Sequence, residues 1–423
     1  MEPQSNKSKG SGGDNSYFSS GADPADSSGQ AQAVPSGGHD ALRQWIADRI
    51  RTSGPVTFAR YMEWALYHPV WGYYTTGPGI GPGGDFTTSP EVSPAFGELM
   101  ARHVADIDTL LGEPPTLNVV EFGPGRGTLA AGLLDTLHAG YRPVYERVAC
   151  WLVEISPALI SAQKRRLLPD HAPLVRWVSG LDELPAGLDG AVLANEFVDA
   201  FPVHVVENHE GQVLEHYVGL DTNGELCITL GGLSDPRLAE FLRRYRVSLV
   251  PGQKIEINLA AEEWIARLGG RLGRGVVTII DYGDVWPARY SDARREGTLL
   301  AYYGGRVSDR LLAHPGGQDL TALVDFTALE QAAHRAGLYT LALTRQAHFL
   351  IGLGLDTTRA FASAGENLQT ALALRRSLQA LVSMEGLGRF HVLVLGKGID
   401  MARARATLSG LRYAHLMEQD PRV

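Results

Sequence analysis

The chain has 423 residues, of which 44% are hydrophobic and 20% charged, so it can bury a large core in one elaborated domain or in two to three smaller ones. A net charge of −9 and an isoelectric point near 5.8 disfavour general nucleic-acid binding, which usually leaves a basic footprint. Cys150 and Cys227 are the only cysteines and the histidines lack zinc-helix spacing, so neither a disulfide framework nor a metal site is expected.

The first 38 residues are rich in serine, glycine, aspartate and proline, and they offer too little apolar surface to fold, so we expect a disordered tail. This tail has no arginine and three aspartates, whereas a mitochondrial transit peptide is arginine-rich and poor in acids. No apolar run is long enough to span a bilayer, and no signal-peptide pattern opens the chain. We therefore expect a soluble protein of the bacterial cytoplasm with no membrane partner.

Two helical patterns begin the part of the chain that is expected to fold. Leu42, Ile46 and Ile50 fall on one face of a helix that starts near Asp40, and residues 55–67 give a second amphipathic helix. The loop after them carries five glycines between positions 77 and 84, a composition that favours a mobile lid.

Asp85 and Thr87 follow these glycines and permit two interpretations. They could bind a cofactor or a substrate, or they could cap the helix predicted from about Pro94 to Leu111, for which Ser93 is the expected N-cap. The residue types alone leave both interpretations open.

A glycine-rich turn follows the first strand of the predicted core. The apolar run 117–122 predicts a strand, and Gly123, Gly125 and Gly127 lead into a helix that starts near Leu129. Alternating glycines let the backbone bend sharply and approach a ligand, while the amides that open the helix can donate hydrogen bonds. A dinucleotide fingerprint would need Gly or Ala at Thr128. The pattern Glu-x-Gly-x-Gly-x-Gly fits S-adenosylmethionine (SAM) instead, although an ordinary strand-to-helix turn would look similar.

Acidic and amide side chains follow the next three predicted strands. Glu154 ends the strand 148–154, where an acid commonly binds ribose hydroxyls, although a solvated glutamate is also common there. Asp182 follows the strand 174–178 and either receives the adenine amine or belongs to a simple turn. Asn195, Glu196 and Asp199 follow a buried strand that starts at residue 190, where open α/β sheets place their ligand crevice.

The remaining patterns complete an α/β fold with a doubly wound parallel sheet. Residues 203–232 alternate as strands separated by two turns, and this β-rich insertion is expected to cover the substrate side. A fifth buried strand ends in Asp281. The expected helices cover residues 236–246, 260–268 and 325–336, and two last strands cover residues 339–344 and 390–395.

Seven sequence blocks, in order, resemble the MidA family of SAM-dependent methyltransferases, which includes the mitochondrial complex I assembly factor that methylates an arginine. This chain departs from the family pattern at Leu323, where a histidine is usual, and at Phe201, where a leucine is usual. The blocks are residues 84–91, 96–99, 121–128, 152–157, 195–202, 280–283 and 319–326.

The resemblance implies a class I (Rossmann-like) methyltransferase fold and SAM as cofactor. The three glycines would hold the methionine end of SAM. If the acceptor is an arginine, a carboxylate would bind its guanidinium and localise its charge, with Glu196 the first candidate and Asp199 or Asp85 the second. These acids could instead orient the backbone or the amino group of SAM. The predicted cofactor-binding residues are Glu121, Gly123, Gly125, Gly127, Glu154, Asp182 and Asn195.

Two other functions stay open at this point. A small-molecule O- or N-methyltransferase would share the cofactor site, and a non-catalytic assembly factor would keep only the fold. The expected partner is a protein or small-molecule methyl acceptor, with no nucleic acid, no membrane and no metal, and a homodimer is allowed. The predicted segments are a tail (1–38), a helical and lid segment (39–112), a methyltransferase core (113–400) with an insertion at about 203–270, and a C-terminal extension (401–423).

Overall fold

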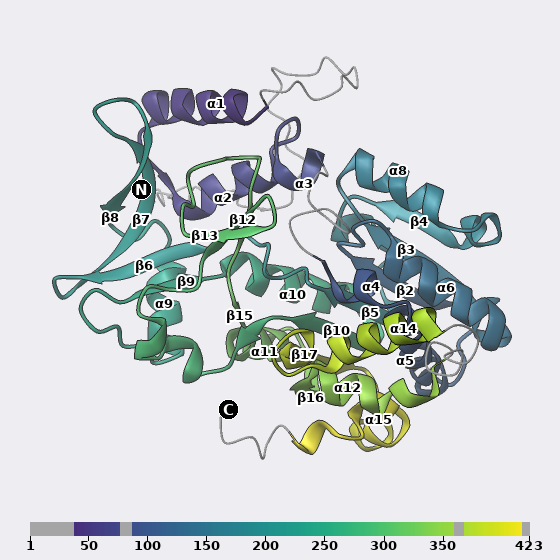
Figure 1. Ribbon diagram of the computed structural model, residues 1–423. Coiled ribbons are helices and arrows are strands. Elements are labelled where there is room, and N and C mark those ends of the chain that lie inside the picture. Colours follow the sequence, from purple (N-terminus) through teal and green to yellow (C-terminus); the bar gives the residue numbers. More distant parts are fainter. Residues whose placement is uncertain (1–37, 77–86, 359–367, 417–423) are drawn as a thin grey trace, which may run out of the picture. The chain divides into compact units, whose positions relative to one another are not determined.

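A computed structural model describes residues 38–76, 87–358 and 368–416 (Figure 1). The predicted disordered tail and the glycine-rich lid fall almost wholly on residues outside these ranges, so both stay predictions. Within the described ranges, no helix is both long and apolar enough to cross a membrane.

A seven-stranded sheet forms the centre of the fold, in the order β16-β17-β10-β5-β2-β3-β4. All neighbouring strands are parallel except β17, which runs antiparallel to β10 and β16. The chain moves outward from β2 to β4 and then returns to β5 on the other side of β2, so the predicted doubly wound sheet is confirmed and its switch point lies between β2 and β5. The strands are β2 (Leu117–Phe122), β3 (Val148–Val153), β4 (Val175–Val178), β5 (Leu188–Asn195), β10 (Leu272–Asp281), β16 (Tyr339–Arg345) and β17 (His391–Lys397).

Helices pack against this sheet (Figure 1), and the longer ones bury apolar side chains on one face. The largest buried cluster joins α5 and α6 to the central strands, with Phe96, Leu133 and Val119 among its members. The helices of this part are α4 (Ser89–Val92), α5 (Ala95–Leu111), α6 (Thr128–Gly140), α7 (Arg142–Tyr145), α8 (Pro157–Arg166), α10 (Leu259–Arg271), α11 (Phe326–Arg335), α12 (Gln346–Gly352), α14 (Leu368–Val382) and α15 (Met401–Thr407).

Chain between β5 and β10 forms most of a second, antiparallel sheet, and the strands predicted over residues 203–232 are confirmed. Its order is β1-β7-β6-β9, with β8 paired to β7. The apolar faces of two N-terminal helices pack on this sheet, where Leu42 and Met62 join Val205 and Val218 in one buried cluster. The elements are α1 (Gly38–Ser53), β1 (Val56–Thr57), α2 (Phe58–Tyr67), α3 (Tyr73–Thr76), β6 (His204–His209), β7 (Gln212–Leu220), β8 (Leu226–Gly231), α9 (Pro236–Arg244) and β9 (Lys254–Ile257).

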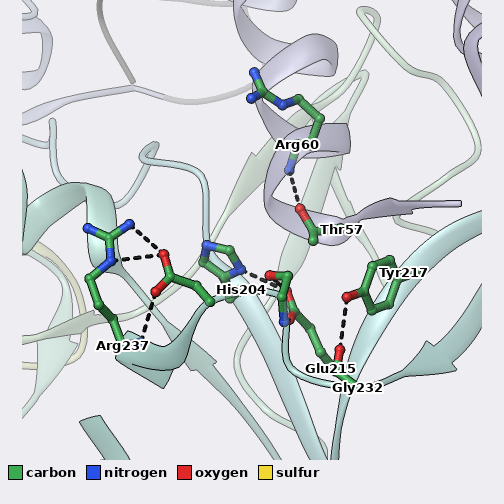
Figure 2. Close-up of polar contacts among 9 residues, drawn as sticks. Thr57, Arg60, His204, Glu215, Tyr217, Gly232 and Arg237 are labelled. Atoms are coloured by element: carbon green, nitrogen blue, oxygen red, sulfur yellow. Dashed lines mark hydrogen bonds and ion pairs between the residues drawn. The ribbon is translucent and has the colours of Figure 1, made fainter. Parts of the chain in front are cut away.

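Polar contacts, some of them buried, fasten this second sheet to the chain that leads into α9 (Figure 2). The carboxylate of Glu215 is fully buried, with its Oε1 2.7 Å from Nδ1 of His204. Its Oε2 accepts a 2.6 Å hydrogen bond from the backbone N–H of Ser234, and the hydroxyl of Tyr217 donates to the carbonyl of Gly232. A buried carboxylate needs such partners, so these contacts fix how β6, β7 and the start of α9 meet.

Two small sheets complete the described structure. In one, β12 (Leu300–Tyr303) pairs with β13 (Arg306–Ser308) on one side and β14 (Asp319–Thr321) on the other. In the other, β11 (Gly283–Asp284) pairs with β15 (Val324–Asp325).

Two predicted helix starts were wrong. The helix predicted over residues 55–67 begins only at Phe58, because Val56 and Thr57 pair with β7. Ser93 is not the N-cap of α5; Pro94 holds that position, and Ser93 ends the short helix α4, which the sequence did not predict. Thr87 is exposed and does not cap α5.

Candidate functional site

The glycine turn between β2 and α6 has the backbone that its sequence predicts. Gly123, Gly125 and Gly127 have φ values of 60°, 53° and 78°, which other residues rarely adopt. A Cβ at Gly123 would lie 2.8 Å from Cδ2 of Phe197, and one at Gly127 would lie 3.0 Å from Cγ of Gln163. A side chain at these positions would therefore be strained and would push on the neighbouring loop or helix.

Two buried acids lie at the carboxyl ends of β2 and β3. Burial, together with the neighbouring Glu154 carboxylate, raises the pKa of Glu121 to about 8. Burial also raises the pKa of Glu154 to about 7, although its Oε1 accepts a 2.8 Å hydrogen bond from the backbone N–H of Ser156. Both carboxyls therefore lie at the edge of the sheet where β2 and β3 end, which is also the edge that carries the glycine turn.

Gln163 connects the turn to Glu154, and the sequence analysis missed it. Its Nε2 donates to the carbonyl of Gly125 at 2.7 Å and to Oε2 of Glu154 at 3.3 Å, while its Oε1 accepts from Nε1 of Trp177 at 2.8 Å. Gln163 is fully buried on the same face of α8 as Leu159, four residues earlier. A polar residue at an apolar position of an amphipathic helix was the signal that could have found it.

Asp182 lies apart from these residues. Its side chain is 73% exposed and accepts hydrogen bonds from Arg267 at 2.7 Å and Arg271 at 3.3 Å. The hydrogen bond and charge of Arg267 hold the pKa of Asp182 below its usual value. To bind adenine, this carboxylate would have to accept a further hydrogen bond beside those from its two arginine partners. Its contact with adenine stays a prediction.

The loop after β5 brings Asn195, Glu196 and Asp199 together as expected. Oε1 of Glu196 accepts from the backbone N–H of Ser89 at 3.0 Å and from Nδ2 of Asn195 at 3.1 Å. Burial raises the pKa of Glu196 to about 7 and that of Asp199 to about 6. Oδ2 of Asp199 accepts from the hydroxyl of Tyr282. Within the described residues, Oδ1 of Asp199 and Oδ1 of Asn195 are buried and have no hydrogen-bond donor.

Asp281, the acid that ends β10, fixes this loop. Its fully buried Oδ2 accepts from the successive backbone N–H groups of Phe197, Val198 and Asp199, at 3.2, 3.0 and 3.2 Å. Its Oδ1 accepts from the backbone N–H of Tyr282 at 2.9 Å. Burial and the charges of Asp199 and Glu196 raise its pKa well above the usual value. We call Glu196, Asp199 and Asp281 the acidic cluster.

Tyrosines from distant segments surround the acidic cluster. The hydroxyl of Tyr67 donates to the carbonyl of Ala200 at 2.9 Å, and that of Tyr74 donates to Oδ1 of the buried Asp319 at 2.8 Å. The rings of Tyr67 and Tyr74 stack with centroids 5.6 Å apart. In the described part of the chain, no arginine, lysine or histidine forms an ion pair with the acidic cluster. A cation bound here would be the first positive charge beside these three carboxyls, and it would favour their ionised forms.

A family model described as "Putative S-adenosyl-L-methionine-dependent methyltransferase" matches residues 99–344, more than half of the chain. The chain belongs to this family. The MidA-like resemblance is thereby confirmed, and the chain is an enzyme that uses SAM to methylate an acceptor.

This MidA-like methyltransferase is similar in sequence to curated proteins and to proteins of solved structure. The chain is 32% identical to the mouse "Protein arginine methyltransferase NDUFAF7, mitochondrial", over 80% of this chain and 78% of that protein. The human protein of the same name is 30% identical to this chain, over 80% of this chain and 77% of that protein. A Burkholderia thailandensis protein solved with bound S-adenosyl-homocysteine is 32% identical, with a TM-score of 0.78, over 87% of this chain and 95% of that one.

The residues of the MidA-like chain fit a SAM molecule at the switch point. The positive φ values of the three glycines turn the backbone sharply after β2, and the first amides of α6 can donate hydrogen bonds. Thr128, which excluded a dinucleotide fingerprint, donates its hydroxyl to Oε1 of Glu91 and so joins α6 to α4. Asp85 lies outside the described residues, and its predicted role stays a prediction.

Proposed function

We propose that this MidA-like methyltransferase transfers the methyl group of SAM to an arginine side chain of a protein. The observation that carries the proposal is the acidic cluster, which has no cationic partner among the described residues and includes Oδ1 of Asp199, a buried acceptor atom without a donor. An arginine guanidinium stays charged and offers five N–H donors and no acceptor, so it complements this arrangement. The printed names of the curated relatives support the same acceptor.

Glu196 and Asp199 are the proposed catalytic residues. When bound, SAM supplies an electrophilic methyl group on a sulfonium. A carboxylate that binds a guanidinium localises positive charge near the nitrogens it contacts and leaves another nitrogen more nucleophilic. Asp199 would bind the guanidinium through Oδ1, and Oε2 of Glu196 would accept the proton that the methylated nitrogen loses. Asp281 would position both residues through the backbone of residues 197–199.

The cofactor would be held by the residues at the carboxyl ends of β2 and β3. Gly123, Gly125 and Gly127 would hold its methionine end, with Glu121 and Asn195 beside it. Glu154 would bind the ribose hydroxyls, Asp182 stays the candidate for the adenine, and Gln163 would set the position of Glu154 relative to the turn. The cytoplasmic location, a homodimer, the lid and the segment boundaries remain predictions from the sequence.

Replacing Gln163 by leucine is expected to raise the Kd of SAM about tenfold, because one amide holds both Glu154 and the carbonyl of Gly125. The KM of the acceptor should change less than about twofold, since Gln163 does not contact the acidic cluster. Calorimetric titration with SAM measures the first quantity and initial rates measure the second. Gln44→Leu, at an exposed position of α1, is the matched control. Unchanged SAM affinity in Gln163→Leu would remove this residue from the cofactor site.

The kcat/KM for an arginine acceptor is expected to rise with pH, to be about half-maximal near the Glu196 pKa of about 7, and to level off about one pH unit above it. Burial raises the pKa of Asp199 to about 6 and of Glu196 to about 7, so both acids take up protons as the pH falls through this range. A protonated carboxyl cannot balance the guanidinium charge, so the loss lies on the acid side. Initial rates at saturating SAM between about pH 5 and pH 9 give the profile. A flat profile would argue against carboxylates that bind a cationic acceptor.

The direct test supplies the purified enzyme with methyl-labelled SAM and two peptides that differ only in an arginine or a lysine. Label on the arginine peptide, located by mass spectrometry, supports the proposal. Label on the lysine peptide alone, or only on small molecules of a cell extract, would contradict it. A folded protein that does not bind SAM in calorimetry would favour the assembly-factor alternative.

A further inference from the structure

One face of the sheet β13-β12-β14 runs from solvent to the acidic cluster. Tyr302 of β12 lies opposite Val307 of β13 and opposite Asp319 of β14, and Leu300 lies opposite Thr321. Opposed residues of antiparallel strands project from the same face, as do residues two apart along one strand. These five side chains therefore share one face, which we call the docking face.

Exposure along the docking face changes in one direction. Asp319 and Thr321 are 1% and 3% exposed, Tyr302 is half-buried, and Leu300 and Val307 are 37% and 58% exposed. The buried end reaches the site, because the hydroxyl of Tyr74 donates to Asp319 and the ring of Tyr74 stacks on that of Tyr67, whose hydroxyl donates to the carbonyl of Ala200, the residue after Asp199. The face thus carries the apolar side chains of Leu300 and Val307 at its outer end and the acid Asp319 at its inner end.

The other face of this small sheet is already covered. Ala301 and Leu320 project from it and are fully buried in the cluster formed with α1 and α2. β13 is an edge strand, which pairs only with β12 in the described structure. Leu300 and Val307 are therefore exposed beside an unpaired strand edge, an arrangement that can accept an extended peptide.

We infer that the docking face binds the segment of the acceptor protein that flanks its arginine, in an extended conformation, with an apolar side chain against Leu300 and Val307. This inference rests on the proposed function. An arginine that reaches the buried acids with its long side chain leaves its own backbone nearer to solvent, where the face is apolar. The carboxyl groups at the inner end and the apolar surface at the outer end together fit a polypeptide with an apolar residue beside the arginine, and neither a free amino acid nor a small metabolite would use both.

The test compares two peptides that contain the same arginine. One has an apolar residue next to this arginine, and the other has a serine at that position. Wild-type enzyme is expected to show a KM about tenfold lower for the apolar peptide, the size expected when one side chain is buried. The double variant Leu300→Ser/Val307→Ser should lose this preference and leave kcat and the Kd of SAM unchanged. Ile351→Ser, on the exposed side of α12, controls for the loss of a surface apolar residue.

The outcomes separate the two proposals. If wild-type enzyme methylates neither peptide, the arginine acceptor itself is wrong. If it methylates both with equal KM, or if the double variant keeps the preference, the docking face is overturned and the arginine acceptor stands. A thermal melt of the double variant that matches wild type shows that any change in KM comes from lost contact with the peptide and not from unfolding.

Discussion

Replacing Asp199 by asparagine is expected to lower kcat about 10²- to 10³-fold, while the Kd of SAM changes less than about twofold. The substitution keeps the shape of the side chain and removes its charge, and the amide oxygen can still accept from the hydroxyl of Tyr282. The loss should follow because Oδ1 of Asp199 is a buried acceptor without a donor in the described structure, placed to meet a charged guanidinium. Single-turnover rates with an arginine peptide, combined with calorimetric titration of SAM, measure both quantities.

Tyr282→Phe is the matched control, because it removes the hydrogen bond to Asp199 and keeps the carboxylate. We expect it to lower kcat by about tenfold or less, the size of one hydrogen bond. If Asp199→Asn weakens SAM binding as much as it slows methyl transfer, then Asp199 orients the cofactor and not the acceptor. If Asp199→Asn is as active as wild type and Asp85→Asn is inactive, the catalytic acid belongs to the segment before α4.

Replacing Gly190 by alanine is expected to lower the free energy of unfolding by more than about 4 kcal/mol, or to prevent soluble expression. A Cβ at Gly190 would lie 1.9 Å from the carbonyl oxygen of Asn118, the residue paired with it in β2. On the other side, a Cβ at Gly275 of β10 would lie 2.0 Å from the carbonyl oxygen of Gly190. The neighbouring backbones therefore leave no space for a Cβ at Gly190 or at Gly275. Urea unfolding of the variant and the wild type measures the difference.

Gly140→Ala is the control for this prediction. Gly140 ends α6, and a Cβ there would meet nothing within 4 Å. Its stability should stay within about 1 kcal/mol of wild type, with a small gain because alanine favours the helix. A Gly190→Ala protein as stable as Gly140→Ala would show that β2 and β5 can separate at little cost.

The sequence alone could predict the sheet because each central strand is a short apolar run between turn signals. Such a run can be recognised from neighbouring residues, without knowledge of distant contacts. The same local patterns placed Glu154, Asn195, Glu196 and Asp199 near the carboxyl ends of their strands. The glycine turn was predictable for a related reason, since positive φ at Gly123 leaves little choice of residue.

The interactions between distant segments could not be predicted. Asp281 accepts from backbone groups 82 to 84 residues earlier in the chain, and no local pattern pairs them. The local sequence could not show that Asp182 pairs with Arg267, because Arg267 lies 85 residues away on another helix. Tyr67 and Tyr74 come from the N-terminal part of the chain. No local pattern there showed that their hydroxyls lie at the site.

The contact between Gly123 and Phe197 bears on how this enzyme can be redesigned. Cδ2 of Phe197 lies 2.8 Å from the place of a Cβ on Gly123, and Phe197 directly follows Glu196, a proposed catalytic residue. A residue larger than glycine cannot be placed at position 123 without moving the loop that holds Glu196 and Asp199. Libraries that aim at new methyl donors or new acceptors should therefore vary positions 123 and 197 together, because selection on either one alone would be constrained by the other.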